Sequence, residues 1–249
     1  LKFKIKRNEL KKKVLLMAGW LKENGIQKGD RVAAYMPNCP ETIITMLATA
    51  SLGAVFSSCS TDFGVSGVLD RFLQIEPKVL VTVDGYLYNG KSIDRSNEVN
   101  EIVKGLKSLK KIVVLKYLNK TFSNHFSFNP ISFDEVYCSN SLDNFEQVYF
   151  NDPLYIVFSS GTTGAPKCIV HGVGGVLLQH SKEHKLQANI KENDRVFYFS
   201  TCGWMMWNWL IGALFSKATI ILYEGNPFYE EPSKLWKLAE KESITLFGT

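Results

Sequence analysis

The chain is organised around the stretch Tyr155-Ile-Val-Phe-Ser-Ser-Gly-Thr-Thr-Gly-Ala-Pro-Lys167. This stretch begins with aromatic and β-branched residues, which favour a pleated strand, and then changes to glycines and small hydroxylated residues. Glycines let consecutive backbone N–H groups turn toward one centre, and such a concavity binds anions. Lys167 adds a mobile positive charge suited to a polyphosphate. The stretch therefore predicts a strand that runs into a phosphate-binding loop.

The loop differs from the common P-loop, whose pattern is G-x-x-x-x-G-K-[ST]. Counted from Gly161, the second glycine position holds Pro166, and Cys168 stands where a hydroxyl residue would hold Mg²⁺. Pro166 has no N–H and biases Ala165 toward an extended conformation. We therefore expect the loop to turn between two strands rather than to open a helix. A plain hairpin loop without a ligand is the alternative, because Gly, Pro, Ser and Thr all favour turns.

The run Ser159-Ser-Gly-Thr-Thr-Gly-Ala-Pro-Lys167 resembles the signature loop of the adenylate-forming (acyl-CoA synthetase) superfamily, [ST]-[ST]-G-[ST]-T-G-x-P-K, at every position. In that superfamily the loop holds the β- and γ-phosphates of ATP, and Mg²⁺ shares in neutralising their charge. The resemblance thus implies an ATP site made by Ser159, Ser160, Gly161, Thr162, Thr163, Gly164 and Lys167. It assigns no metal ligand in this chain.

Strand-like and helix-like segments alternate along the chain. Before the loop, the pattern predicts strands at 31–36, 54–59, 78–83 and 111–117 and helices at 14–24, 41–52, 67–75 and 97–106. After it, the pattern predicts strands at 168–171, 195–200, 218–223 and 244–247 and helices at 175–188, 206–215 and 232–242. This alternation predicts an α/β fold of mostly parallel sheets with helices on both faces. By resemblance, residues 1–249 are part of the large N-terminal (adenylation, or AMP-binding) domain, without the C-terminal domain.

Residues 119–152 interrupt the alternation. They are rich in Asn, Ser and Phe, with Pro130 near the centre. We expect an irregular insertion here, and the alternative is an ordered loop that packs its phenylalanines.

The charge of the 249-residue chain is unevenly distributed. Its formal net charge is +5, and seven of its 29 basic residues lie within the first 13 positions beside one acidic residue, Glu9. A basic arm could bind nucleic acid or acidic lipid, but the apolar spacing through Leu10, Val14 and Met17 favours a helix with a solvated face. We therefore expect no nucleic-acid partner, and no apolar run is long enough to span a membrane.

The five cysteines are odd in number and include no C-x-x-C pair. This usage favours a reducing compartment, so we expect a cytoplasmic protein. The chain begins with Leu1, close to a helix-like pattern, and we expect both ends to be cuts in a longer protein.

Cys202-Gly-Trp-Met-Met-Trp-Asn-Trp209 gathers three tryptophans and two methionines. Such residues bury large areas, so a core helix face would explain the run. The run also resembles the G-W-x-x-x-x-W segment of acetoacetyl-CoA synthetases, one family of the superfamily. In related short-chain enzymes this segment adjoins the acyl pocket, which implies a substrate pocket lined by Gly203, Trp204, Met205 and Met206. Acetate-activating enzymes carry a smaller, more polar pair in place of the two methionines, so the resemblance favours another short acid.

The segment Tyr88-Asn-Gly-Lys91 is similar to the same family. In acetyl-CoA synthetases, basic residues in this neighbourhood contact the phosphates of coenzyme A. The resemblance implies a contact between CoA and Lys91, whereas Tyr88 stands where the other basic residue would be.

His180-Ser-Lys-Glu-His184 matches the zinc-protease pattern H-x-x-E-H. Histidines four apart share a helix face and could bind Zn²⁺. The polar residues between them indicate instead a solvated helix face, and we expect no metal there.

The resemblance implies activation of acetoacetate to acetoacetyl-CoA through an acyl-adenylate, with ATP, Mg²⁺ and CoA. The alternatives are a synthetase for acetate or propionate and an inactive ATP-binding truncation product. The family's adenine-stacking motif, Mg²⁺-binding Glu, ribose-binding Asp and catalytic Lys all follow later than Thr249. We therefore expect the catalytic residues downstream and expect that residues 1–249 alone do not make acyl-CoA.

Overall fold

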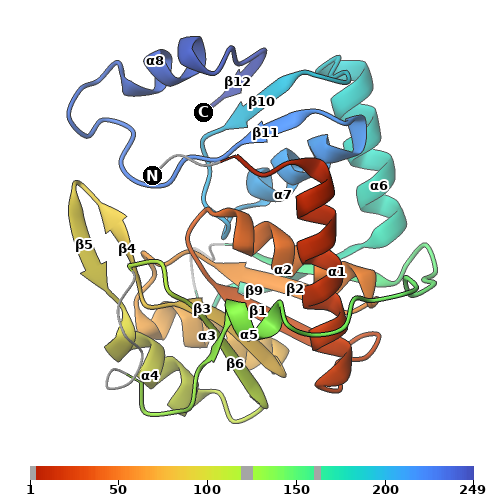
Figure 1. Cartoon of the computed structure of the whole chain (residues 1–249), viewed down its shortest axis with the longest axis vertical. Helices are drawn as coiled ribbons and strands as arrows, with labels where there is room; N and C mark the ends of the chain where they lie inside the picture. Colours follow the sequence, from red (N-terminus) through yellow and green to blue (C-terminus); the bar gives the residue numbers. More distant parts are fainter. Residues whose placement is uncertain (1–3, 119–125, 160–163) are drawn as a thin grey trace.

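The computed structural model describes residues 4–118, 126–159 and 164–249. The predicted ATP-binding residues Ser160, Gly161, Thr162 and Thr163 lie outside these ranges. Within them the strands form a seven-stranded sheet, a three-stranded sheet and a two-stranded hairpin (Figure 1). The predicted α/β class with mostly parallel strands is confirmed.

The large sheet has the order β7-β6-β3-β1-β2-β8-β9. Every neighbouring pair is parallel except the last, because β9 returns antiparallel to β8. Its strands are β1 (Arg31–Tyr35), β2 (Val55–Cys59), β3 (Val79–Val83), β6 (Lys111–Leu115), β7 (Ile131–Ser132), β8 (Pro153–Ser159) and β9 (Lys167–Gly172). Because β1 connects to β2 on one side and β3 lies on the other, the order of the strands reverses at β1 and β3.

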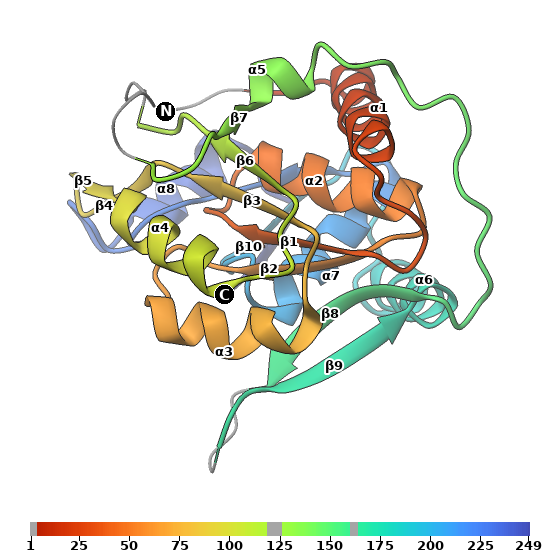
Figure 2. The ribbon, with the colours of Figure 1, turned by 90° about the horizontal axis from the view of Figure 1, so that it is seen from below.

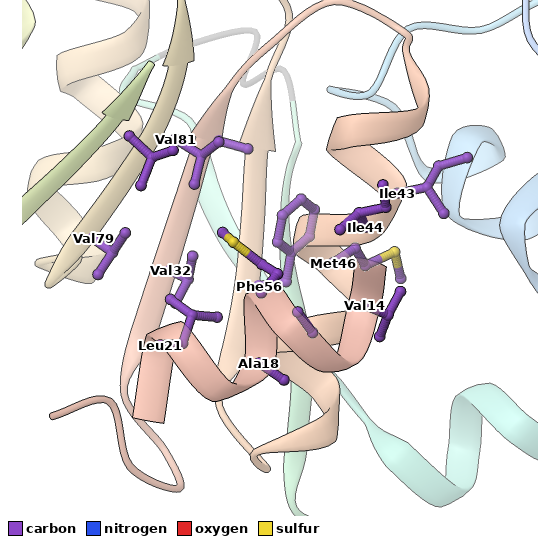
Figure 3. Packing of buried hydrophobic residues seen from close by; sticks show 14 of the residues in the cluster. Val14, Ala18, Leu21, Val32, Ile43, Ile44, Met46, Phe56, Val79 and Val81 are labelled. Carbon is purple, nitrogen blue, oxygen red and sulfur yellow. The ribbon is translucent and has the colours of Figure 1, made fainter. Parts of the chain in front are cut away.

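Helices cover both faces of this sheet. α1 (Arg7–Glu23) and α2 (Pro40–Ser51) lie on one face, and α3 (Val65–Ile75) and α4 (Ser96–Gly105) lie on the other (Figure 2). Val32 and Val81 point toward α1 and α2, where Phe56 also packs (Figure 3), whereas the adjacent Ala33 and Leu80 join the opposite cluster. Strand side chains alternate between faces, and both faces are covered here, so the central strands read as continuous apolar runs.

The three-stranded sheet has the order β11-β10-β12, and its strands are also parallel. It consists of β10 (Arg195–Tyr198), β11 (Thr219–Ile221) and β12 (Leu246–Gly248). The helical segments of this half are α6 (Val173–Lys182), the π-helical turn η2 (Glu183–Gln187), α7 (Met205–Gly212), the 3₁₀ turn η3 (Ala213–Ser216) and α8 (Lys234–Lys241). A small apolar cluster joins β10 to α7 and η3 through Val196, Leu210 and Ala213.

A hairpin that the sequence analysis did not predict follows β3. Its strands are β4 (Gly85–Tyr88) and β5 (Lys91–Asp94), joined at Asn89 and Gly90, which both have positive φ angles. Asn-Gly is the preferred pair for a two-residue hairpin turn, since both positions must enter the left-handed region. The signal was therefore present in the sequence.

The structure describes residues 126–152 of the segment that interrupts the alternation. They include β7 and α5 (Phe133–Val136), whose first turn is closed by a capping box between Ser132 and Glu135. Phe126 and Phe128 pack against the cluster under α3 and α4, and Phe133 is buried in the cluster under α1 and α2.

The basic residues from Arg7 to Lys13 lie in α1, as the apolar spacing predicted. In the part of the chain that the structure describes, no helix is long and apolar enough to cross a membrane.

Candidate functional site

The predicted phosphate loop joins two paired strands. Ser159, the last residue of β8, lies directly opposite Lys167, the first residue of β9. The prediction of a turn between strands is thus confirmed, and the two described ends of the loop are held side by side. Ser159 is half-buried, while Gly164 and Lys167 are exposed. The lysine side chain is therefore accessible to a ligand at this end of the sheet.

Strand β8 is fixed against β2. Tyr155 pairs with Phe56 and Ile156 with Ser57, and the Ser57 hydroxyl donates to the Ile156 carbonyl at 2.9 Å. Since the two strands are parallel, Ser159 and the residues after Cys59 emerge at the same carboxyl edge. That edge is where ligands bind in open α/β sheets.

The returning strand is held by the last turn of α3. The Gln74 side chain donates to the Pro166 carbonyl at 2.8 Å and accepts from the Cys168 thiol at 3.4 Å. The Arg71 guanidinium lies over the rings of Phe63, at 4.6 Å, and Phe158, at 5.8 Å. These contacts orient the backbone next to Lys167. The sequence analysis missed Gln74, because nothing in its local pattern shows that α3 ends beside the loop.

The tryptophan-rich segment divides into a buried and an exposed part. Trp207 is fully buried and stacks on Phe56, with ring centroids 6.3 Å apart, so the core interpretation holds for this residue. Trp204 is 62% exposed and Met205 46% exposed, and Met206 is half-buried. The large apolar side chains of Trp204 and Met205 are therefore available to line a pocket.

Gly203 lies against the end of β2. A Cβ on Gly203 would stand 3.4 Å from the Ser60 nitrogen and 3.7 Å from the Phe63 ring. The Ser58 hydroxyl donates to the Cys202 carbonyl at 2.7 Å. The segment with the candidate pocket residues and the strand that ends at Ser159 thus meet at the ends of adjacent strands.

Lys91 is exposed at the start of β5, opposite Tyr88. The hairpin is tied to the same edge of the sheet by Arg95, whose Nε donates to the Thr61 carbonyl at 3.0 Å. Arg95 also pairs with Glu98 and receives the Tyr86 ring beneath its guanidinium. The sequence analysis did not assign Arg95, since it did not predict the hairpin.

The two histidines of the zinc-like pattern are not on a solvated face. His184 is only 1% exposed and packs edge-on against Trp209, at 4.5 Å, because the π-helical turn points it toward α7. Burial lowers the pKa of His180 to about 4 and also lowers that of His184. The expected solvated face is therefore wrong, and both imidazoles are held neutral inside the packing of α6 and α7.

Among residues 4–118, 126–159 and 164–249, no three His, Cys, Asp or Glu side chains gather closely enough to hold a metal ion. All five cysteines are free.

Comparison with known proteins gives consistent matches. The family model described as AMP-binding enzyme matches residues 4–249. The acetoacetyl-CoA synthetase of Gallus gallus is 44% identical over 253 aligned residues, covering 99% of this chain and 38% of that protein. The acetoacetyl-coenzyme A synthetase of Rhizobium meliloti (strain 1021) is 45% identical over 262 aligned residues, with the same coverage.

A solved structure of acetoacetyl-CoA synthetase from Streptomyces lividans superposes with a TM-score of 0.92 at 40% identity. The match covers 97% of this chain and 37% of that one, so the chain spans a little over a third of the length of these relatives. Since the family model matches almost every residue and includes the loop, the tryptophan-rich segment and the hairpin, the chain belongs to the family of AMP-binding enzymes.

Proposed function

We propose that this chain is part of an enzyme that uses ATP to activate acetoacetate and transfers the acyl group to coenzyme A. The observation that carries the proposal is the meeting of two unlike surfaces at the ends of β2 and β8. One is polar and consists of Ser159, Gly164 and Lys167, where β8 ends and β9 begins. The other is the apolar pair Trp204 and Met205. A polyphosphate and a small acyl group would thus be bound side by side. The similarity to acetoacetyl-CoA synthetases supports this acid.

In the first step, a carboxylate oxygen of the acid attacks the α-phosphorus of ATP, and the bond to pyrophosphate breaks. Lys167, with Ser159, Ser160, Gly161, Thr162, Thr163 and Gly164, would hold the departing pyrophosphate and neutralise its charge. Such electrostatic stabilisation and alignment are the main contributions a protein makes to phosphoryl and adenylyl transfer. Mg²⁺, when bound, would supply further charge neutralisation on the phosphates.

In the second step, the sulfur of coenzyme A attacks the acyl carbon, the thiol proton is lost, and AMP leaves with the electron pair of the broken bond. Gly203, Trp204, Met205 and Met206 would shape the acid pocket. Lys91, exposed on the hairpin, would contact a phosphate of CoA. We propose the cytoplasm as the location, supported by the five free cysteines.

The test uses the full natural protein, purified with whatever sequence flanks residues 1–249. AMP release is measured with ATP, Mg²⁺ and CoA on acetoacetate, acetate and propionate. We expect the highest kcat/KM with acetoacetate. Higher kcat/KM with acetate or propionate would replace acetoacetate with that acid, and ATP binding without AMP release would favour the inactive product.

Lys167→Ala tests the phosphate role. We expect kcat/KM for ATP to fall on the order of 10²-fold, as when one charge-stabilising group is removed from a transition state. The matched control is Lys12→Ala, which removes an exposed lysine from α1. An equal effect of both variants, or none, would contradict the assignment.

A further inference from the structure

Asn38 lies between the two sheets, and every polar atom of its side chain is hydrogen-bonded. It lies in the loop between β1 and α2 and is 5% exposed. Its Nδ2 donates to the carbonyls of Ser200 and Tyr223, both at 3.1 Å. Its Oδ1 accepts from the Trp207 indole Nε1 at 2.9 Å. Both donors of the amide and its oxygen are thus paired, which fixes the orientation of the side chain.

The backbone of the same residue is also bound. The Asn38 N–H donates to Glu224 Oε2 at 2.6 Å. The partners come from three segments next to the small sheet: Ser200 follows β10, Tyr223 and Glu224 follow β11, and Trp207 lies in the first turn of α7. Asn38 therefore holds three separate segments of the small sheet against the large one.

This contact stands at a special place in the fold. Asn38 follows β1, at the point where the strand order of the large sheet reverses between β1 and β3. In open α/β sheets the crevice at such a point usually receives a ligand. Here Asn38, at this point, binds segments of the same chain through hydrogen bonds to Ser200, Tyr223, Glu224 and Trp207.

The segment that Asn38 holds carries the candidate acid pocket. Residues 200–207 are fixed at Ser200 and Trp207 by Asn38, and Cys202 is fixed by the Ser58 hydroxyl at 2.7 Å and by its thiol, 3.0 Å from the Met36 carbonyl. Between these attachments, Trp204 and Met205 remain exposed. A rigid base with free apolar side chains is the arrangement that a binding pocket requires.

We propose that Asn38 is a positioning residue for the acid pocket: through Trp207 and Ser200 it sets where Met205 and Met206 stand relative to the ends of β2 and β8. The proposal rests on the function proposed above. Asn38 touches no substrate in this assignment and acts only through the segment that it binds.

The kinetic test compares Asn38→Ala with wild type in the full natural protein. The substitution leaves two carbonyls and the Trp207 N–H without partners, so α7 is released at its first turn. We expect KM for acetoacetate to rise about tenfold or more while KM for ATP changes less than about twofold, since misplacement of a positioned group chiefly affects the substrate that it faces.

The control for general loss of stability is Val113→Ala, in β6, two strands away from β1. It lowers the melting temperature without touching residues 200–207, and we expect both KM values to stay unchanged. Trp207→Phe removes the indole donor and part of the buried ring. The double variant of Trp207→Phe and Asn38→Ala leaves no unpaired indole N–H at residue 207. We therefore expect its rise in KM to be smaller than the sum of the rises in the two single variants.

A second readout is independent of activity. Amide hydrogen exchange of residues 200–209 in the unliganded protein should be about tenfold faster in Asn38→Ala, while exchange in β3 and α4 stays unchanged. Unchanged exchange at 200–209, or equal rises in both KM values, overturns the proposal. Faster exchange with no turnover of any acid by wild type instead overturns the proposed function and the pocket assignment, and leaves the attachment of α7 by Asn38 in place.

Discussion

Glu224 lies in the loop after β11, and its environment disfavours the ionised form of its carboxyl group. The pKa of this carboxyl is raised to about 7, chiefly by burial and in smaller part by nearby Asp62, while the hydrogen bond from the Asn38 N–H acts in the opposite direction. The two buried thiols of Cys39 and Cys202 lie close by, and burial raises their pKa values too. The carboxyl therefore changes its charge near neutral pH, at the junction of the two sheets.

This pKa gives a prediction for stability. The folded protein binds the Glu224 proton more tightly than the unfolded chain, whose carboxyl titrates near 4.5. The stability that the protonated Glu224 carboxyl contributes to the folded protein is fully present below about pH 4.5 and is lost as pH rises through about 7. Glu224→Gln keeps the acceptor for Asn38 without the charge, so we expect it to exceed wild type in unfolding free energy by about 3 kcal/mol at pH 8 and to match it at pH 4.5.

Urea unfolding of both proteins at the two pH values measures the difference. Comparing the two proteins cancels the titration of His171 and His180, which both share. A gap of the same size at both pH values would show that Glu224 does not titrate in this window.

At the level of single residues, the sequence indicated which side chains are candidates for a role but not which residues they contact in the fold. The loop residues and the segment from Gly203 to Met206 are proposed as site residues from their local pattern. Asn38 and Gln74 were not, because each acts on residues about a hundred or more positions away. Their roles depend on which strand ends meet, and that is decided by the order of strands in the sheet.

Among the elements, α7 packs closely against α6 and η2 where Gly212 faces His180 and His184. A Cβ on Gly212 would stand 2.5 Å from His180 Nδ1 and 2.8 Å from His184 Cε1. We expect Gly212→Ala to lower the unfolding free energy by about 1–3 kcal/mol, because the buried rings cannot both move aside.

The matched control is Gly175→Ala in α6, where an added Cβ meets no atom within 4 Å. That change should leave stability equal or raise it by about 0.5–1 kcal/mol, since alanine favours a helix over glycine. Thermal or urea unfolding of the two variants decides the matter. Similar values for both would mean that α6 and α7 tolerate separation.

Element prediction succeeded where apolar periodicity was strong and failed where tertiary contacts override it. The helix expected at 175–188 changes at Glu183 into a π-helical turn, which brings His184 under Trp209. The sequence showed polar neighbours and indicated a solvated face. The hairpin at 85–94 was missed although its Asn-Gly pair is a strong turn signal, because its strands are short and half exposed.

For the whole molecule, the stacking of Phe56 on Trp207 joins the core of the large sheet to the helix of the small one. We expect Phe56→Ala to lower the unfolding free energy by about 3–5 kcal/mol, the usual loss for a buried aromatic ring. Both sheets should lose stability together. Leu73→Ala, which shortens an exposed side chain of α3, should change little.

The measurement follows urea unfolding with hydrogen exchange in β3 and β12 as separate probes. One shared transition in wild type and variant supports the joint core. Two transitions that separate in Phe56→Ala would show that the sheets are stable independently.

The alternation of strands and helices predicted the class of the whole fold, because each βα unit buries an apolar face in the same way. It did not show which strands belong to which sheet. The two sheets are linked by hydrogen bonds of Asn38, Ser58 and Trp207, and such single polar contacts leave no periodic pattern in a sequence.

The pairing of Ser159 with Lys167 has a consequence for how this hairpin tolerates change in length. Side chains of a strand point alternately to its two sides, so the lysine keeps its direction only if an even number of residues is gained or lost within β9. A deletion of Ile169 alone would turn Lys167 to the opposite side, to where Cys168 now points.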